Sequence, residues 1–439
     1  MDPSQPIHSP RITHRRTAHL MILLIATALL SACAIDDSTS VKAATQSATR
    51  PQTSREKMWA LLRVDDRPLS AVVLMEKMVR EKELNAQVFA QFYAITGDEQ
   101  GTLEIIDADA KPSTSPATPL DAYTQRDALD AIAAAAQGTR IVILNEYHHI
   151  QRHRAFALQV AWRLRKEGFT TFAAETFNTD VEKTLVNGIP VLNTGGYSID
   201  PPFGDLIRQS LRAGYRIFDY EDRDEHEGAD QRDYRQGIAL REQAQADNIK
   251  RWLDKNPDAR VFIYVGGSHG AETPDEAGNE WMASRLKKMT GIDPLTLSQV
   301  SGGARPEYDG PTMRAATALG AKKPFVLIDK SGAPMSRFGY DMLVFHPRVA
   351  DRYGRPGWLA MDGYRQPVPV TLSPMPGRTL LRAYVMDEPA GRIAMDQVLV
   401  PPNATSATLM LPKGKYSLVV QDEAGVNQDL RNVSVLDPR

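Results

Sequence analysis

Short apolar segments alternate with helical segments from residue 141 to about residue 300, and this alternation constrains the fold more than any other feature. The predicted strands cover residues 141–145, 170–175, 215–220, 260–265 and 295–299. The segments between them are long enough for crossover helices, which parallel strands require. The sequence therefore predicts an α/β protein with an open, mainly parallel sheet that carries helices on both faces.

Helical periodicity supports this arrangement between the predicted strands. After the first strand, Ala157, Val160, Ala161 and Leu164 recur at i, i+3, i+4 and i+7, and Gly168 marks the end of the helix. Further helices are predicted over residues 128–136, 204–213, 234–253 and 280–289. Two more strands are predicted at 324–329 and 341–345, so we assign residues 120–370 to the α/β domain.

The pattern changes after residue 377. Short strands are predicted at 380–385, 397–400, 407–411 and 416–421, with turn sequences between them. We predict a small all-β, sandwich-like domain over residues 377–439. Because this segment shows no catalytic constellation, we interpret it as an interaction or packing module.

The first 33 residues have the features of a targeting signal. Arg11, Arg15 and Arg16 precede an apolar run at 20–30 that is too short to span a membrane. The run ends in Leu-Ser-Ala-Cys, which resembles a bacterial lipobox, so Cys33 is the predicted lipidation site and membrane anchor. The residues after Cys33 resemble those of outer-membrane lipoproteins, which would face the periplasm. An ordinary signal peptide with a chance cysteine is the alternative.

Residues 34–54 are rich in Ser, Thr, Ala and Gln and are predicted to be a flexible tether. Residues 55–119 form an N-terminal segment and linker, in which 73–79 is predicted as a helix and 87–96 or 102–106 as strands. The 439-residue chain has 52 basic and 54 acidic residues, a formal charge of −2, which gives no electrostatic case for nucleic-acid binding. Cys33 is the only cysteine in the sequence, which excludes disulfides within it and thiolate metal sites.

Ionisable side chains follow four successive predicted strands. In a parallel α/β sheet the carboxyl ends of the strands line one crevice, where ligands bind. The groups that this rule brings together are Glu146, His148 and His149 after the first strand, Glu175 at the second, Asp219, Glu221 and Asp222 at the third, and Gly266, Gly267 and His269 after the fourth. Their coincidence predicts an active or binding site at this edge.

Each of these residues also has a structural interpretation. Glu175 follows an apolar run, so we expect partial burial to raise its pKa towards use as a general acid or base, although it could instead cap a helix. His269 follows two glycines, which permit close approach of a ligand to the backbone. Asp219 and Glu221 lie in a run of charged residues, and the usual structure of such a run is a solvated loop. Arg241, with Glu242, could be a surface ion pair.

These landmarks resemble the superfamily that joins erythromycin esterases, ChaN-like heme-uptake lipoproteins and TraB/Tiki proteins. The matching motifs are Asn-Glu-Tyr-His-His at 145–149 and Gly-Gly-Ser-His at 266–269, with Glu175, Asp219 and Arg241 between them, over roughly residues 125–300. Asn145 stands where the family usually has glycine. Either His148 or His149 aligns with the family histidine, so the resemblance leaves the subfamily open.

The leading hypothesis is a hydrolase of an ester, lactone or peptide, acting on a small-molecule or peptide substrate. Glu146 or Glu175 would activate water, while His148 or His149 and His269 would position it, stabilise charge or hold a divalent metal such as Zn or Mn. The resemblance implies metal-free esterase-like members and metal-dependent Tiki-like ones. One alternative is a protein that binds heme or another cofactor through Tyr147 or a histidine, beside Gly266 and Gly267. Another is an envelope interaction protein with an inert α/β scaffold.

Overall fold

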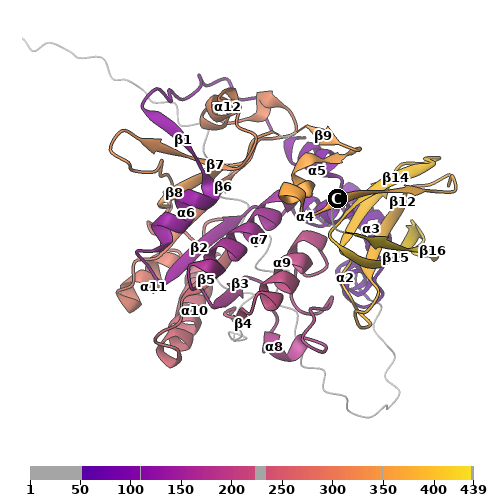
Figure 1. Cartoon of the computed structure of the whole chain (residues 1–439), viewed down its shortest axis with the longest axis horizontal. Coiled ribbons are helices and arrows are strands. Elements are labelled where there is room, and N and C mark those ends of the chain that lie inside the picture. The colour runs from indigo at the N-terminus through magenta and orange to yellow at the C-terminus, as the bar shows by residue number, and fades with distance from the viewer. Residues whose placement is uncertain (1–51, 109, 223–233, 349, 437–439) are drawn as a thin grey trace, which may run out of the picture.

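The computed structural model describes residues 52–108, 110–222, 234–348 and 350–436. It contains an eight-stranded sheet flanked by helices and a C-terminal antiparallel β region (Figure 1). The predicted signal peptide and lipobox at 1–33, with Cys33, lie outside the described residues, as does most of the predicted tether at 34–54. None of the described helices combines the length and apolar character needed to cross a bilayer.

The large sheet has the strand order β1-β7-β8-β6-β2-β5-β3-β4. From β8 to β4 all neighbours are parallel, whereas β7 and β1 add an antiparallel edge. This confirms the predicted open, mainly parallel sheet. The strands are β1 (Tyr123–Asp127), β2 (Ile141–Glu146), β3 (Thr171–Ala174), β4 (Arg216–Phe218), β5 (Val261–Gly266), β6 (Leu295–Val300), β7 (Phe325–Asp329) and β8 (Met342–Phe345).

Helices cover both faces of this sheet, as predicted. Along β2, Val142 and Leu144 pack in the core shared with α7, whereas Ile141 and Ile143 pack in the core shared with α10 and α11. Because both faces are covered, the strand is apolar at every position from Ile141 to Leu144 rather than alternating. The helices around the sheet are α6 (Ala128–Ala136), α7 (Gln151–Lys166), α8 (Val181–Thr184), α9 (Pro201–Arg212), α10 (Tyr234–Lys255), α11 (Met282–Thr290) and α12 (Pro311–Ala318).

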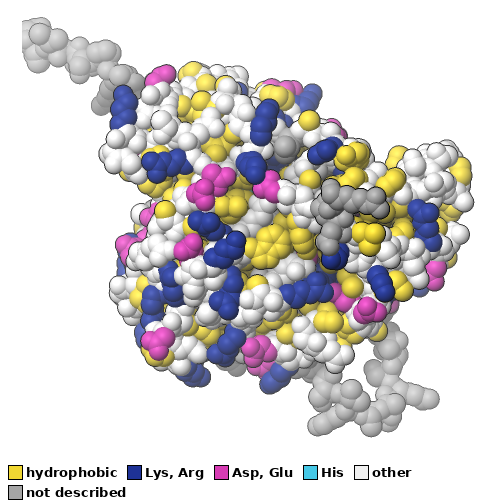
Figure 2. All heavy atoms as spheres, viewed as in Figure 1, with side chains coloured by type: hydrophobic (Ala, Val, Ile, Leu, Met, Phe, Trp, Pro, Cys, Tyr) yellow, Lys and Arg dark blue, Asp and Glu magenta, His cyan; other side chains and the backbone are white. Residues whose placement is uncertain are grey.

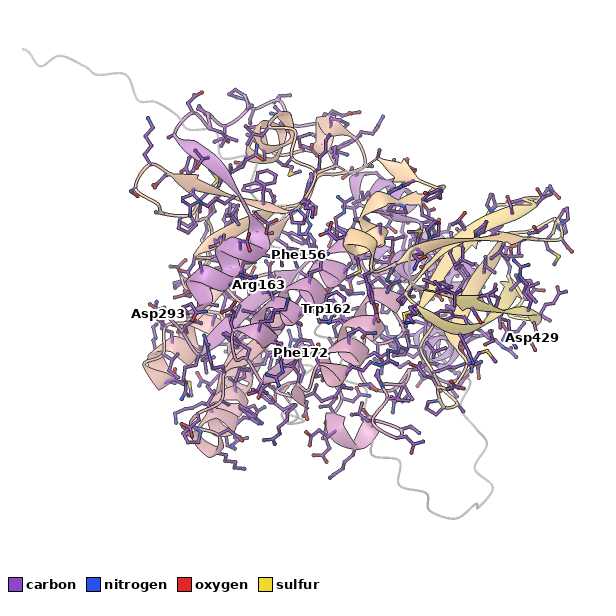
Figure 3. All side chains as sticks on the ribbon, viewed as in Figure 1. Phe156, Trp162, Arg163, Phe172, Asp293 and Asp429 are labelled. Atoms are coloured by element: carbon purple, nitrogen blue, oxygen red, sulfur yellow. The ribbon has the colours of Figure 1, made fainter. Side chains whose placement is uncertain are left out.

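The chain reverses its direction across the sheet after β4. It moves outward from β2 to β3 and β4, then returns through α10 to insert β5 between β2 and β3. Glu146 at the end of β2 pairs with Gly266 at the end of β5, and Ala174 of β3 pairs with Tyr264. Phe172 of β3 packs on Phe262 of β5 with ring centroids 5.5 Å apart (Figure 3). The polar groups after these three strands therefore share one edge.

The N-terminal segment is helical, so the strands predicted at 87–96 and 102–106 are wrong. Asn85 and Asp98 cap the two helices that replace them by accepting hydrogen bonds from Val88 and Gly101. The buried residues of α4 run continuously from Val88 to Phe92 instead of alternating as in a half-buried strand. The elements are α2 (Ser54–Arg63), α3 (Pro68–Arg80), α4 (Ala86–Tyr93), the 3₁₀ turn η1 (Ala94–Thr96) and α5 (Glu99–Asp107).

The C-terminal region contains two antiparallel layers with a shared core. One pairs β11 with β14, and the other has the order β13-β12-β15-β16; Val370 and Leu409 from the first layer share a cluster with Leu381 and Leu418 from the second. The four predicted strands are present, whereas β11, which carries two prolines, and the polar β16 were not predicted. The strands are β11 (Gln366–Thr371), β12 (Thr379–Val385), β13 (Asp396–Val400), β14 (Ser406–Leu411), β15 (Gly414–Asp422) and β16 (Asn427–Val435).

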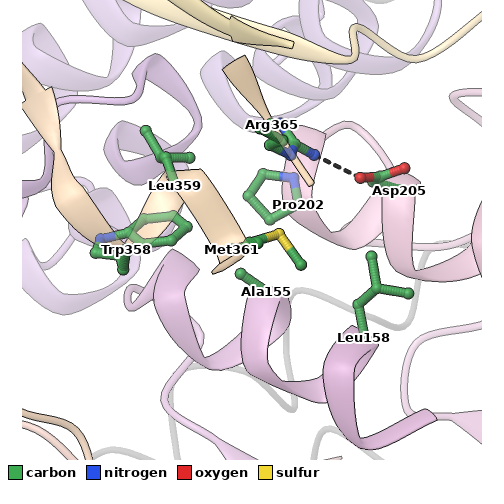
Figure 4. Close-up of a pocket in the computed structure, with 8 residues that line it drawn as sticks. All are labelled: Ala155, Leu158, Pro202, Asp205, Trp358, Leu359, Met361 and Arg365. Carbon is green, nitrogen blue, oxygen red and sulfur yellow. Dashed lines mark hydrogen bonds and ion pairs between the residues drawn. The ribbon is translucent and has the colours of Figure 1, made fainter. Parts of the chain in front are cut away.

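A connecting segment joins the sheet to the antiparallel region. It contains β9 (Asp351–Arg352), β10 (Arg355–Pro356) and the 3₁₀ segment η4 (Gly357–Gly363), whereas the 3₁₀ turn η3 (Pro306–Tyr308) lies between β6 and α12. Figure 4 shows apolar side chains of η4 beside α7 and α9, and the ion pair between Arg365 Nη2 and Asp205 Oδ2 at 2.6 Å. A second buried ion pair, Arg208–Glu388, joins α9 to the antiparallel region, where Glu388 lies between β12 and β13. Basic and acidic side chains are interspersed over the face shown in Figure 2.

Candidate functional site

Glu146 is the centre of a hydrogen-bond network at the end of β2. Its buried carboxylate accepts two hydrogen bonds from Arg154, from Nε to Oε2 and from Nη2 to Oε1, both 2.8 Å long. The Tyr264 hydroxyl donates to Oε2 at 2.7 Å, and His148 Nδ1 lies 2.6 Å from Oε1. Three side chains, from α7, from β5 and from the turn after β2, thus make four polar contacts with one carboxylate.

Arg154 is a fully buried cation on α7. Its Nη1 lies 2.9 Å from Asp200 Oδ2, and its guanidinium stacks over the Tyr197 ring at 4.9 Å. Burial alone would raise the pKa of Glu146, but the charge and hydrogen bonds of Arg154 outweigh it and hold that pKa well below its usual range. Glu146 is therefore ionised at neutral pH and is a poor proton acceptor.

Glu146 fixes the orientation of His148. The imidazole also stacks on Tyr197, with ring centroids 4.6 Å apart. Because the ionised carboxylate only accepts hydrogen bonds, the proton of a neutral His148 sits on Nδ1 and leaves the lone pair on Nε2. The geometry thus brings His148, of the two adjacent histidines, onto Glu146.

Gly266 joins this network to the second half of the site. A Cβ atom at this position would lie 2.5 Å from Nε2 of His148 and 2.8 Å from Oε2 of Glu175. The imidazole and the carboxylate therefore converge on the same backbone atom, which only glycine permits. The Gly266 amide also donates a hydrogen bond to Glu175.

Glu175 follows β3 and is buried, as predicted, but its pKa moves in the opposite direction from the prediction. Burial alone would raise the pKa of this carboxyl, yet the charges of His269 and Arg241 outweigh it and lower the pKa well below its usual range. Arg241 Nη2 donates to Oε1 at 2.7 Å. The sequence shows the apolar run before Glu175 but cannot show the guanidinium, which comes from α10.

Arg241 connects three other groups of the site. Besides Glu175, it contacts Glu221 through Nη2 at 2.9 Å and Nε at 3.3 Å, and its Nη1 lies 3.1 Å from Nε2 of His269. Gln245 also donates to Glu221 at 3.0 Å. Arg241 and Glu221 are thus part of the site rather than a surface ion pair and a solvated loop.

His269 lies between two carboxylates and the Arg241 guanidinium. Its Nδ1 is 2.7 Å from Oε1 of Glu242, and its Nε2 is 3.5 Å from Oε1 of Glu175. Burial opposes protonation, but Glu242 and Glu175 outweigh it and raise the pKa of His269. In the neutral form the proton lies on Nδ1 towards Glu242, because Arg241 can only donate to Nε2.

The remaining predicted residues lie around this cluster. Asp219 accepts a hydrogen bond from the backbone of Val181 at 3.2 Å and lines a cleft together with Phe218 and Trp252. His149 stands beside Tyr147, with ring centroids 6.2 Å apart, and burial lowers its pKa to about 4. Gly267 has a left-handed φ of +43°, and its carbonyl accepts a hydrogen bond from Tyr340.

The donor set does not fit a divalent metal. Both Glu146 and Glu175 are directly paired with guanidinium groups, which compete with a cation for the same oxygen atoms. Within the described residues no group of three or more His, Cys, Asp or Glu side chains has the arrangement of a metal site. We therefore derive no step through Zn or Mn at His148 and His269.

The sequence interpretation missed Arg154 and Tyr264 as parts of the site, and it considered Glu242 only together with Arg241. Two of them carried a usable signal, because a charged residue stood in the apolar stripe of a helix. Arg154 is in register with Ala157, Leu158 and Ala161 of α7, and Glu242 is in register with Ile238, Ala246 and Ile249 of α10. Tyr264 gave no such signal, since aromatic residues are ordinary in buried strands.

Comparison with known proteins gives only remote similarities, and neither a family model nor a curated protein matches the chain. The type III effector HopBA1 has 16% identity and a TM-score of 0.31, over 42% of this chain and 88% of that one. ChaN of Campylobacter jejuni, with cofacial heme binding, has 11% identity and a TM-score of 0.31, over 49% and 100%. RRSP, a MARTX toxin effector domain from Vibrio vulnificus, has 15% identity and a TM-score of 0.27, over 58% and 48%.

Proposed function

We propose that the chain is a hydrolase that cleaves an ester, lactone or peptide bond, with His148 as general base. The observation that carries this proposal is the 2.6 Å contact between Glu146 Oε1 and His148 Nδ1, beside the Arg241–His269 pair. A carboxylate that fixes the tautomer of a histidine leaves the other ring nitrogen available to accept a proton. This corrects the expectation that Glu146 or Glu175 would itself be the base.

The reaction follows from this assignment. His148 Nε2 removes a proton from a water molecule, whose oxygen forms a bond to the carbonyl carbon of the substrate. The bond from that carbon to the leaving oxygen or nitrogen then breaks, and the leaving group takes the proton back from His148. Glu146 remains ionised throughout and stabilises the imidazolium that forms in between.

Arg241 and His269 supply the positive charge that the reaction needs. The carbonyl oxygen becomes negative when water attacks, and the field of fixed positive groups stabilises such an oxygen in a partly dry site without a direct hydrogen bond from them. The exposed fractions of the side chains are 10% for His148, 13% for His269 and 16% for Arg241, whereas Glu146 and Glu242 are almost fully buried. The imidazole and guanidinium groups, together with Glu221 at 20%, are therefore the parts of the cluster that reach solvent.

The test is hydrolysis of fluorogenic esters, lactones and peptides by the wild-type protein and by Glu146→Gln. Loss of the carboxylate charge should reduce kcat by about 10²-fold or more, because it no longer fixes or stabilises the imidazolium. Glu276→Gln, which removes an exposed carboxylate elsewhere, is the matched control. Equal kcat values for the wild-type protein and Glu146→Gln would contradict the proposed roles.

Heme or cofactor binding is a second candidate, favoured by the exposure of Tyr147. This side chain is 37% exposed and lies beside two imidazoles, His149 at 6.2 Å and His153 at 5.9 Å between ring centroids. Tyrosine and histidine are both axial ligands of heme iron. Titration with hemin should give a Soret band that Tyr147→Phe weakens and the control Tyr353→Phe does not. No spectral change on titration would exclude this function.

We also propose that the protein is anchored to the outer membrane through Cys33 and faces the periplasm. The support is the sequence alone: basic residues, a short apolar run and a lipobox-like tetrapeptide. Labelled palmitate should be incorporated into the full chain and lost in Cys33→Ala, which should also leave the membrane fraction. Incorporation that persists in Cys33→Ala would contradict this anchor.

A further inference from the structure

The contacts of the site contain more negative than positive charge. Among the described residues, two guanidinium groups, those of Arg154 and Arg241, stand in a network with five carboxylates. The carboxylates are those of Glu146, Glu175, Glu221, Glu242 and Asp200. With both histidines neutral, this leaves an excess of three negative charges, and the excess remains negative when His148 and His269 are protonated.

Neither arginine is available as a clamp for an anionic substrate. Arg154 is fully buried, and its donors face Glu146, Asp200 and the His148 carbonyl. Arg241 reaches solvent, but its Nε, Nη1 and Nη2 groups already contact Glu221, His269 and Glu175. A carboxylate or phosphate on the substrate would have to displace these contacts and approach the remaining carboxylates, which like-charge repulsion disfavours.

The surroundings of Glu221 extend this negative field and provide space. A cleft of about 550 Å³ opens beside it, since Asn248, which lines the cleft, donates a hydrogen bond to the Glu221 carbonyl at 2.9 Å. Phe218 and Trp252 form a stacked aromatic wall, with ring centroids 4.5 Å apart. The charged lining residues are Asp180, Asp219, Asp222 and Asp247, against Arg251 and Lys255.

We infer that the substrate of this site carries a positive charge close to the scissile carbonyl, and that the site discriminates against anionic substrates. This inference rests on the proposed hydrolase function. It follows from the charge excess of the catalytic contacts, the engaged donors of both arginines, and the cleft beside Glu221. Aromatic faces together with carboxylates are the environment that binds ammonium and guanidinium groups.

The test uses three esters of 4-nitrophenol with acyl groups of nearly equal shape. They are 4-(trimethylammonio)butanoate, the neutral 5,5-dimethylhexanoate and the anionic 4-sulfobutanoate. For the wild-type protein at low salt, kcat/KM should fall by about tenfold from the cation to the neutral ester and again to the anion. Added salt should reduce the cation-to-neutral and the neutral-to-anion ratio of kcat/KM, because screening by ions weakens the electrostatic field of the site.

A charge-removing variant tests where the preference originates. Asp222→Asn removes a charge from the cleft, so it should lower the ratio of kcat/KM for the cationic ester to kcat/KM for the neutral ester. Asp258→Asn, an exposed position in the turn before β5, is the matched control and should leave this ratio unchanged. An unchanged ratio in Asp222→Asn would overturn the contribution of the cleft.

The outcomes separate the two proposals. Hydrolysis of all three esters with the anion preferred, or with equal rates, would overturn the charge preference and leave the hydrolase proposal in place. Hydrolysis of none of them, with a folded protein, would overturn the hydrolase proposal and the inference that rests on it. The predicted order of cation, neutral ester and anion supports both.

Discussion

The buried ion pairs at the sheet edge and those between α9 and the C-terminal part of the chain have different surroundings. The sheet-edge pairs are Glu146–Arg154 and Glu175–Arg241; the interface pairs, between α9 and the C-terminal part of the chain, are Arg208–Glu388 and Arg365–Asp205. Each sheet-edge carboxylate also faces an imidazole that reaches solvent. Among the described residues, no histidine contacts an interface pair.

This difference shows that burial of charge does not by itself identify a functional site. Structural ion pairs also perturb pKa values, as the raised pKa of Arg365 illustrates: burial opposes its charge, but Asp205 outweighs that effect. What distinguishes the sheet edge is a titratable ring between the buried charge and solvent. We therefore expect substitutions at the interface to affect stability and substitutions at the sheet edge to affect activity.

The largest effect on stability should come from breaking an interface pair. Asp205→Ala leaves the Arg365 guanidinium buried without its carboxylate, which should reduce the free energy of unfolding by about 3–5 kcal/mol. Urea denaturation measures this change, and the activity of the remaining folded protein should equal that of the wild type. If the cost were below about 1 kcal/mol, the interface pairs would not differ from surface pairs.

A sheet-edge substitution should reverse this balance. Glu146→Gln leaves Arg154 paired with Asp200, so the free energy of unfolding should fall by only about 1–3 kcal/mol. Compared with Asp205→Ala, Glu146→Gln should cause the smaller loss in free energy of unfolding, measured by urea denaturation. It should also cause the larger loss in kcat. A larger stability loss than that of Asp205→Ala, with unchanged kcat, would remove the distinction between the two regions.

Protonation offers a third comparison, because burial holds His346 neutral whereas Glu242 and Glu175 raise the pKa of His269. Burial lowers the pKa of His346 from 6.5 to about 3. The unfolded chain therefore binds an extra proton below pH 6.5, and stability is lost as the pH falls from about 6.5 towards 3. His346→Asn should reduce this slope by up to about 1.4 kcal/mol per pH unit. Unfolding curves at pH 4, 5 and 6 give the slope, and an unchanged slope would contradict neutral burial.

Two neighbouring glycines sharpen the comparison at the sheet edge itself. Gly266→Ala would place a methyl group against His148 and Glu175, so activity should fall about tenfold or more, the cost of a misplaced catalytic group. Gly267→Ala meets no atom within 4 Å, and its left-handed backbone should cost roughly 1 kcal/mol of stability with little change in activity. Equal activity of the two variants would show that Gly266 is not part of the site.

The smallest effect is expected at an exposed ion pair. Lys77 and Glu81 stand at i and i+4 on α3, 3.8 Å apart, with side chains 61% and 49% exposed. Replacing Glu81 with Gln should change the free energy of unfolding by less than about 0.5 kcal/mol. A change as large as that of Asp205→Ala would show that burial does not determine how much an ion pair contributes to the free energy of unfolding.

Much of the fold could be predicted because the sheet is built from local patterns. Apolar residues recur with the spacing of a buried strand at 141–145 and with the spacing of a helix at 128–136. The alternation of such strands and helices along the chain then predicts a parallel sheet. The strands β11 and β16 were not predicted, because the prolines of β11 and the exposed polar residues of β16 interrupt the alternation of apolar and polar residues that indicates a strand. The helices α4 and α5 were missed because their apolar residues also fit short strands.

The site was predictable only where it lies at the end of a strand. Glu146, His148, Glu175 and His269 follow buried strands, so their convergence follows from the sheet. The pairing of charges does not, because Arg154 and Arg241 come from helices whose rotation about their axes is set by tertiary packing. The predicted rise in the pKa of Glu175 failed for this reason: burial was foreseen and the guanidinium was not.

The most direct test of the central claim compares His148→Ala with His149→Ala. These adjacent residues have the same chemistry, but only His148 contacts Glu146 among the described contacts. On the best ester, lactone or peptide, kcat/KM should fall by about 10²–10⁴-fold in His148→Ala and by less than about threefold in His149→Ala. Full activity in His148→Ala, or a greater loss in His149→Ala, would contradict the assignment of His148 as the general base.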